Sequence, residues 1–231
     1  MHIPDGFINV PTSMGAGIAA FGGVGVALRR SARTLADRQV PLAGLVAAFV
    51  FAAQMLNFPI AGGTSGHLIG GALAAILVGP WTAVLCMAVV VLVQALFADG
   101  GLTAIGLNML NLAVVATLGG YAIFLGCRRL LPASRWGLSS AGGLAAGVSV
   151  LLAAMAFIVE FALGGPTDGS LGSVTAAMLG VHTLIAFCEG AITAAALRLV
   201  LGTRPDLVHG AGVLGTQGMP ATARSAVGSG R

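Results

Sequence analysis

The feature that most constrains this chain is its shortage of charge across long apolar stretches. Of its 231 residues, 57% are hydrophobic and only 8% are charged. A soluble domain carries about 25% charged residues, so these few charges cannot cover a water-exposed surface of this size. We therefore expect lipid to be the solvent for most of the chain, and we predict an all-α, polytopic membrane protein.

Seven apolar runs are candidates for membrane-spanning helices, each of which needs about 20 predominantly apolar residues. The third run is short, and Gly79-Pro80 separates it from the fourth because proline cannot continue a helix interior. We count both as helices, since the combined run would be too long for one ordinary span. The predicted spans are Phe7–Leu28, Pro41–Phe58, His67–Val78, Trp81–Phe97, Ala104–Leu125, Ala141–Leu163 and Val174–Leu201.

The basic residues provide an independent check on the count of about seven helices. All of them are arginines that lie after the first and fifth spans and at or beyond the end of the seventh. With seven spans they share one side, which the positive-inside rule assigns to the cytoplasm. We therefore predict that the N-terminus is outside and the C-terminus cytoplasmic. Short clusters between apolar runs also do not form a basic face, so we expect no nucleic-acid partner. The clusters are Arg29, Arg30, Arg33 and Arg38; Arg128, Arg129 and Arg135; and Arg198, Arg204, Arg224 and Arg231.

The domain organisation is simple. We expect residues 1–204 to form a single transmembrane domain, which also holds the candidate metal site described next. Residues 205–231 are rich in Gly, Ala, Ser and Thr and lack periodicity, which predicts a flexible cytoplasmic tail. No basic segment precedes the first apolar run, so we expect no cleaved signal peptide.

The first candidate site is the N-terminus itself. The α-amine of Met1, the amide nitrogen of His2 and its ring Nδ1 can close two fused chelate rings on one metal ion, provided that the amide proton leaves. Ni(II) and Cu(II), which favour planar nitrogen sites, can drive that loss. We expect Met1 to be retained, because the side chain of His2 is too large for ordinary removal of Met1. The alternative is an exposed histidine at a frayed terminus.

The second candidate is the run from Gly62 to His67, on the same predicted outer side. Its glycines would let the loop approach another backbone closely, and His67 would supply a fourth nitrogen. Thr64 and Ser65 could hydrogen-bond the second ring nitrogen of a ligand histidine. The alternative is a helix-capping loop with an incidental histidine.

Further polar residues lie in or beside the apolar runs. Asp99 begins an outer loop, and Asn108 and Asn111 follow it inside a predicted span; they either support the metal loop or join helices. His182 and Glu189 are seven residues apart and share a helix face, which suggests a buried polar pair that fixes packing or helps coupling. Glu160 is a further intramembrane acid with no assigned role.

The sequence resembles the CbiM/NikM family in four motifs that occur in order. They are Met1-His2-Ile3-Pro4-Asp5-Gly6-Phe7; Gly66-His67-Leu68-Ile69-Gly70-Gly71; Phe97-Ala98-Asp99-Gly100-Gly101-Leu102-Thr103 with Asn108; and His182 with Glu189-Gly190. The resemblance covers roughly residues 1–200. Members are substrate-binding subunits of energy-coupling factor transporters for cobalt and nickel.

The resemblance implies a seven-helix fold in the cell (inner) membrane, with the metal held by Met1, His2 and His67. It also implies a transmembrane coupling subunit, a pair of ABC-type ATPases and a small accessory membrane protein as partners. Cobalt or nickel would be the transported substrate, with no organic cofactor. The tail after Leu201 lacks the extra helices of fused nickel versions, which favours cobalt and a link to cobalamin biosynthesis. A planar four-nitrogen site, in contrast, suits Ni(II).

Two other functions are weighed against a metal-uptake subunit. A membrane metalloenzyme would need an open coordination position, which a closed four-nitrogen site lacks. A stand-alone secondary carrier would show related halves with a site at mid-membrane. The chain shows no G-x-x-x-x-G-K-[ST] loop, so energy from ATP would have to come from other chains.

Overall fold

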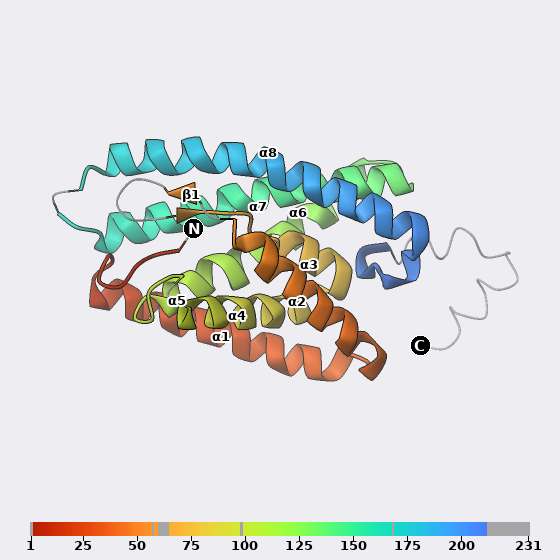
Figure 1. Ribbon diagram of the computed structural model, residues 1–231, viewed down its shortest axis with the longest axis horizontal. Helices are drawn as coiled ribbons and strands as arrows, with labels where there is room; N and C mark the ends of the chain where they lie inside the picture. Colours follow the sequence, from red (N-terminus) through yellow and green to blue (C-terminus); the bar gives the residue numbers. More distant parts are fainter. Residues whose placement is uncertain (1, 57, 60–64, 98, 168, 212–231) are drawn as a thin grey trace, which may run out of the picture.

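The computed structural model describes residues 2–56, 58–59, 65–97, 99–167 and 169–211, and it is a helical bundle (Figure 1). Apart from the two-residue strands β1 (Phe58–Pro59) and β2 (Ser65–Gly66), which pair antiparallel, its regular elements are helices. The helices are α1 (Val10–Thr34), η1 (Asp37–Gln39), α2 (Val40–Gln54), α3 (Gly71–Val78), α4 (Pro80–Leu96), α5 (Ile105–Asn108), the π-helix η3 (Met109–Ala116), α6 (Thr117–Leu130), α7 (Arg135–Gly164), α8 (Leu171–Thr203), η4 (Pro205–Leu207) and η5 (His209–Ala211).

Side-chain caps and a Gly-Pro break explain several of these boundaries. Asn9 accepts a hydrogen bond from the amide of Thr12 and begins α1, and Ser134 does the same for α7, which satisfies backbone donors at the helix starts. Gly79 adopts φ +88° and Pro80 opens α4. Proline is tolerated at a first helical position because no intrahelical bond is lost there, so α3 and α4 are separate helices, as predicted.

The lengths of the helices support a polytopic membrane protein. Among the described residues, four stretches are long and apolar enough to cross a bilayer: Val10–Thr34, Ile105–Leu130, Arg135–Gly164 and Leu171–Thr203. Helices α2 and α4 are apolar but shorter. Helix α3, with eight residues, is only about 12 Å long at 1.5 Å per residue. The predicted span His67–Val78 is therefore wrong over residues 67–70, which form a non-helical segment that ends at Gly70 with φ +76° and leads into α3.

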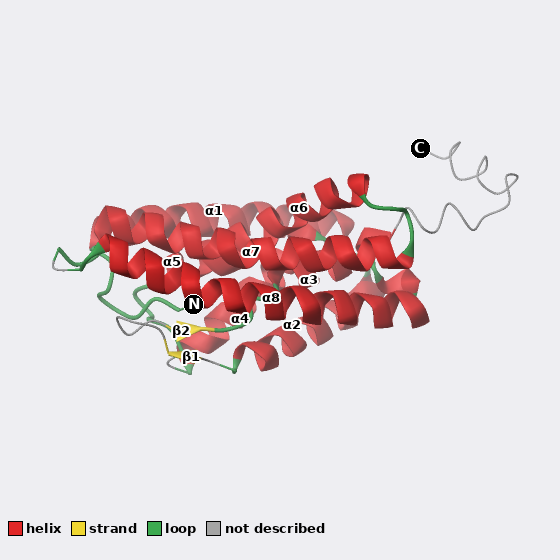
Figure 2. Ribbon diagram, turned by 90° about the horizontal axis from the view of Figure 1, so that it is seen from above, coloured by secondary structure: helices red, strands yellow, loops and turns green. Residues whose placement is uncertain are grey.

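The arginine-bearing ends of the helices gather at one end of the bundle. Figures 1 and 2 show the end of α1, the α6–α7 connection and the end of α8 at that end, with β1, β2 and the N-terminus toward the other. There the guanidinium of Arg198 lies over the ring of Trp136 at 3.0 Å, and Arg30 lies over Trp81 at 5.2 Å. This distribution agrees with the predicted clusters, while the orientation in a membrane stays a prediction.

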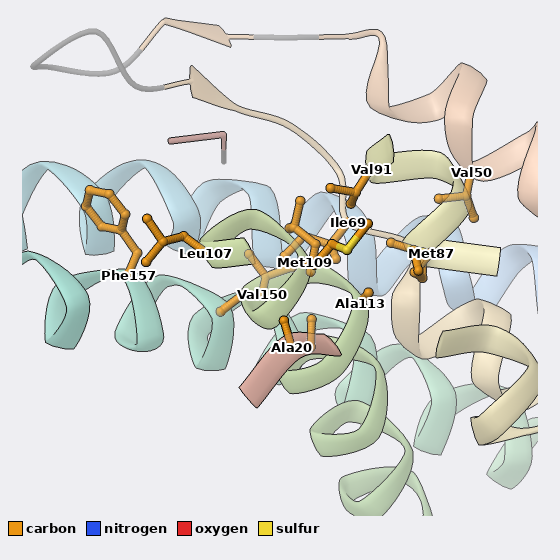
Figure 3. Packing of buried hydrophobic residues seen from close by; sticks show 14 of the residues in the cluster. Ala20, Val50, Ile69, Met87, Val91, Leu107, Met109, Ala113, Val150 and Phe157 are labelled. Carbon is orange, nitrogen blue, oxygen red and sulfur yellow. The ribbon is translucent and has the colours of Figure 1, made fainter. Parts of the chain in front are cut away.

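The main apolar core lies between α1, α2, α4, η3 and α7. Figure 3 shows Val50, Met87, Val91, Met109 and Ile69 packed together there. Ile69 belongs to the non-helical segment 67–70 and is fully buried. The segment that carries His67 is therefore held inside the bundle rather than at its rim.

The first residues of the predicted tail are ordered, which differs from the expectation for 205–231. Val208 and Ala211 are buried in a second apolar cluster with Phe124. The Arg128 guanidinium donates to the carbonyl oxygen of Gly210 at 3.1 Å. These contacts give residues 205–211 a partner surface that composition did not reveal, and residues 212–231 lie outside the described part of the chain.

Candidate metal centre

The N-terminal segment is bound inside the bundle by backbone hydrogen bonds. The backbone amide of Ile3 donates to Asn108 Oδ1 at 2.8 Å, and Asn108 Nδ2 donates to the Ile3 carbonyl at 3.1 Å. The amide of Gly101 donates to the same carbonyl at 2.9 Å. Since both polar groups of Ile3 are satisfied and its side chain is fully buried, the residue that follows His2 is fixed in position.

The loop that begins at Asp99 covers this segment from the other side. Asp5 Oδ1 accepts from the Thr103 amide at 2.6 Å and from the Thr103 hydroxyl at 2.5 Å. These hydrogen bonds from Thr103 lower the pKa of the Asp5 carboxyl. Gly100 has φ +104°, and a Cβ added there would lie 3.2 Å from His2 Cδ2. The two glycines of the Asp-Gly-Gly motif therefore allow the loop to close over His2.

His2 and His67 come together inside this enclosure. Their rings stack with centroids 4.5 Å apart and planes 29° apart, and their exposed fractions are 4% and 0%. His2 Nε2 lies 3.1 Å from Gln94 Oε1, and His67 Nδ1 lies 2.6 Å from the Leu68 carbonyl oxygen. The structure thus joins the two histidines that the sequence predicted as ligands.

One nitrogen of each ring has no hydrogen-bond partner among the described residues: His2 Nδ1 and His67 Nε2. A carbonyl can only accept, so His67 Nδ1 carries the hydrogen and His67 Nε2 presents a lone pair. Asp99 Oδ1 lies 3.2 Å from His2 Nδ1, so a carboxyl group stands beside this ring nitrogen. Unsatisfied buried polar atoms are uncommon in proteins, and two of them together indicate a place for a ligand.

Burial controls the charge of both histidines. Desolvation lowers the pKa of His2 below its ordinary value and lowers that of His67 well below it. Both imidazoles are therefore neutral near pH 7, the form in which a ring nitrogen binds a metal ion. Neutral imidazoles suit borderline transition metals such as Co, Ni, Cu and Zn rather than Mg or Ca.

The described residues contain no cluster of three or more His, Cys, Asp or Glu side chains that could hold a metal ion. A metal between the two histidines would therefore need ligands beyond a cluster of these four residue types. The α-amine of Met1 and the His2 amide are the predicted ones. Met1 lies outside the described residues, so its part in the site stays a prediction.

The histidine-supporting role predicted for Thr64 and Ser65 is filled differently. The ring nitrogen of His67 that would need support contacts the Leu68 carbonyl instead. Ser65 belongs to strand β2, with its backbone paired to Pro59. Thr64 lies outside the described residues. A backbone carbonyl can orient a ligand histidine as well as a hydroxyl can. A contact with a backbone carbonyl cannot be predicted from the sequence, because every residue carries this group.

Glu189 of α8 holds the segment that carries His67. Its carboxyl oxygens accept from the backbone amides of Ile69 at 2.5 Å and Gly70 at 2.7 Å. The predicted pair of His182 and Glu189 is not formed, since His182 Nδ1 instead contacts the Met178 carbonyl at 2.8 Å. Their seven-residue spacing puts them on one face of α8, but both carboxyl oxygens of Glu189 already accept hydrogen bonds from the backbone of the His67 segment.

Asn111 and Glu160 join two helices away from the histidines. Asn111 Nδ2 in η3 donates to Glu160 Oε2 in α7 at 2.7 Å. Both side chains are buried. This contact accounts for Asn111 as a residue that joins helices and gives Glu160 a structural partner.

Two buried residues of the site were missed by the sequence reasoning, Gln54 in α2 and Gln94 in α4. Gln94 contacts His2, and Gln94 Nε2 donates to Gln54 Oε1 at 2.8 Å. The available signal was an amide side chain inside an apolar run, which is costly in a membrane unless it is hydrogen-bonded.

Comparisons with known proteins identify relatives of this chain among metal transport proteins. A family model described as the cobalt uptake substrate-specific transmembrane region, CbiM, matches residues 2–207. The chain is 37% identical to the cobalt transport protein CbiM of Sorangium cellulosum, over 73% of this chain and 76% of that one. It is 39% identical to the fused nickel transport protein NikMN of Rhodobacter capsulatus, over 90% of this chain and 64% of that one. A crystal structure of a truncated transition metal transporter has a TM-score of 0.76 and 29% identity, covering 87% of this chain and 99% of that one.

Proposed function

Because the chain belongs to the CbiM family of cobalt and nickel transport components, we propose that it is the substrate-binding subunit of an ATP-driven energy-coupling factor importer. In this role it captures one divalent transition-metal ion at the outer face of the cell (inner) membrane. It acts as a transporter subunit rather than as an enzyme.

The observation that carries the proposal is the pair of unpartnered nitrogens, His2 Nδ1 and His67 Nε2, on stacked and fully enclosed rings. In the proposed complex these two atoms, the Met1 α-amine and the deprotonated His2 amide surround the ion. Asn108 and Gly101 hold Ile3, which keeps the adjoining chelate in place. The two histidine rings are in contact before the metal arrives, which reduces the ordering cost of binding.

We propose Co(II) as the transported ion, with Ni(II) as the alternative. Relatives named for each metal are similar to this chain at 37% and 39% identity. The chain spans 64% of the fused nickel protein. Four nitrogens in one plane favour Ni(II) at equilibrium, so selection for cobalt would depend on availability and on coupling to transport.

The partners belong to the same proposal. A transmembrane coupling subunit and a pair of ABC-type ATPases would supply the energy, with a small accessory membrane protein beside them. A closed site without an open coordination position argues against a metalloenzyme. The proposed ligands come from the N-terminal segment and the segment before α3 rather than from broken helices shared by two related halves, which argues against a secondary carrier.

Two ligand substitutions test the proposal. His2→Ala and His67→Ala should each weaken Co(II) and Ni(II) binding by more than the roughly 10- to 100-fold that loss of an outer-shell partner costs. His209→Ala is the matched control, because His209 is exposed in η5 beside the ring of Tyr121. Binding would be measured by equilibrium dialysis of purified protein against each metal. Wild-type affinity in either ligand variant would refute the proposed site.

A further inference from the structure

A chain of buried amide groups connects the His67 segment to the ring of His2. Gln54 Nε2 donates to the Ile69 carbonyl oxygen at 2.6 Å. Gln54 Oε1 accepts from Gln94 Nε2 at 2.8 Å, and Gln94 Oε1 lies 3.1 Å from His2 Nε2. Both glutamine side chains are fully buried, with exposed fractions of 0%, so water does not compete for these groups.

The direction of every bond in this chain follows from its first member. A backbone carbonyl can only accept, so the group of Gln54 that faces Ile69 is the NH₂ group. Gln54 therefore presents its oxygen to Gln94, and Gln94 must turn its own NH₂ group toward that oxygen. The oxygen of Gln94 is then the atom left to face His2.

We propose that Gln54 and Gln94 form a relay that fixes the tautomer of His2, with the hydrogen on Nε2 and the lone pair on Nδ1. The oxygen of Gln94 can only accept, so His2 Nε2 must donate to it. The neutral ring has one hydrogen, and Nδ1 is left bare. Nδ1 is the atom that closes the six-membered chelate ring with the His2 amide. Gln54 and Gln94 are positioning residues, and the inference rests on the proposed metal site.

The relay opposes a competing arrangement. Asp99 Oδ1 lies 3.2 Å from His2 Nδ1, near enough to accept a hydrogen from that nitrogen after a small rotation. If the hydrogen were on Nδ1, the ring could not offer Nδ1 to a metal until the hydrogen had left. With Gln94 accepting from Nε2, the ring keeps its hydrogen on the side away from the metal.

The relay also couples the two histidine ligands. It starts at the carbonyl of Ile69, two residues after His67, and the amide of the same residue is bound by Glu189. When Glu189 of α8 binds the His67 segment, the Ile69 carbonyl oxygen is positioned to accept the hydrogen bond from Gln54. The position of one ligand therefore determines the protonation site of the other.

Nitrogen-15 NMR of metal-free protein labelled at histidine tests the tautomer directly, because protonated and bare ring nitrogens differ in chemical shift and coupling. The signals of His2 are identified by their loss in His2→Gln. The expected result is a hydrogen on Nε2 of His2 and on Nδ1 of His67. A hydrogen on Nδ1 of His2 in the wild type would overturn the relay.

Variants of the two glutamines separate the relay from simple packing. Gln54→Met does not touch His2, yet it should release the amide of Gln94 and move hydrogen to His2 Nδ1. Gln94→Met should do the same, and each should weaken Co(II) binding about 10- to 100-fold. Gln54→Glu is the matched control, because a neutral carboxyl can donate to Ile69 and accept from Gln94; it should keep the wild-type tautomer and affinity.

These readouts distinguish failure of the relay from failure of the proposed function. The relay is wrong if both methionine variants keep the Nε2 hydrogen on His2 and bind Co(II) as tightly as wild type. If the tautomer shifts as expected but wild-type protein binds neither Co(II) nor Ni(II), the relay stands and the metal-uptake function falls.

Discussion

Replacing Glu189 by Gln tests how strongly the His67 segment depends on α8. The carboxyl group accepts from two consecutive backbone amides, those of Ile69 and Gly70, at 2.5 and 2.7 Å. An amide side chain has one oxygen, so it can satisfy only one of these donors, and its NH₂ group would face the other. The substitution is nearly isosteric, so the effect reports the hydrogen bonds rather than packing.

The magnitude follows from leaving one buried donor without a partner, which costs about 1–3 kcal/mol. If that cost must be met to hold His67 in its binding position, the affinity for Co(II) should fall about 10- to 100-fold. Isothermal titration of the purified protein would measure the affinity. Hydrogen exchange at the amides of Ile69 and Gly70 should become faster, because one of them is no longer held.

Glu160→Gln is the matched control, since the oxygen of the new side chain can still accept from Asn111. It should leave the affinity for metal unchanged. Metal binding within twofold of wild type in Glu189→Gln, with exchange at Ile69 and Gly70 also unchanged, would refute the view that α8 positions the His67 segment.

Three further predictions concern pH and the N-terminal segment. Since burial lowers the pKa of His2 and His67, above about pH 6.5 the metal displaces hydrogen only from the α-amine and the His2 amide. Affinity should then rise about two powers of ten per pH unit up to the pKa of the amine near 7.7, and a flat profile in titrations from pH 6.5 to 7.5 would contradict these ligands. For metal-free protein the lowered pKa values mean that the unfolded chain binds more protons, so stability should fall as pH decreases below about 6.5, as thermal unfolding would show. Asn108→Ala removes both hydrogen bonds to Ile3 and should weaken Co(II) binding about 10-fold or more. Asn111→Ala is the control and should leave the affinity near that of wild type. Equal affinities of the two variants in a binding titration would show that the N-terminal segment needs no support from Asn108.

Much of this arrangement could be predicted from single residues. The shortage of charge predicts the membrane bundle, and the Gly79-Pro80 break predicts two helices where one apolar run continues. His2 and His67 could be proposed as partners because few histidines occur and both precede apolar spans on one predicted side. These inferences depend only on local chemistry and on the order of elements along the chain.

Contacts between distant segments could not be predicted in this way. Gln54 and Gln94 are 40 residues apart, and each alone indicates only that some hydrogen bond must exist. The apolar run predicts a helix that begins at His67, but Glu189 binds Ile69 and Gly70, 120 and 119 residues away, in a non-helical segment. Tertiary hydrogen bonds of this kind override local helix propensity.

The short helices after Thr203 illustrate the same limit. Their composition is that of a flexible segment, yet Val208 and Ala211 pack against Phe124. The apolar surface that orders them belongs to α3 and α6, so no pattern within the segment itself reports it.

The most direct test of the account is the metal content of protein with and without a permanent N-terminal extension. An extension converts the α-amine of Met1 into an amide, which removes one proposed ligand while leaving His2 and His67 in the chain. The same extension placed at the C-terminus is the control. After dialysis against equal Co(II) and Ni(II), native and C-terminally extended protein should each hold one ion, and N-terminally extended protein should hold almost none. One tightly bound ion in the N-terminally extended protein would contradict the proposed centre.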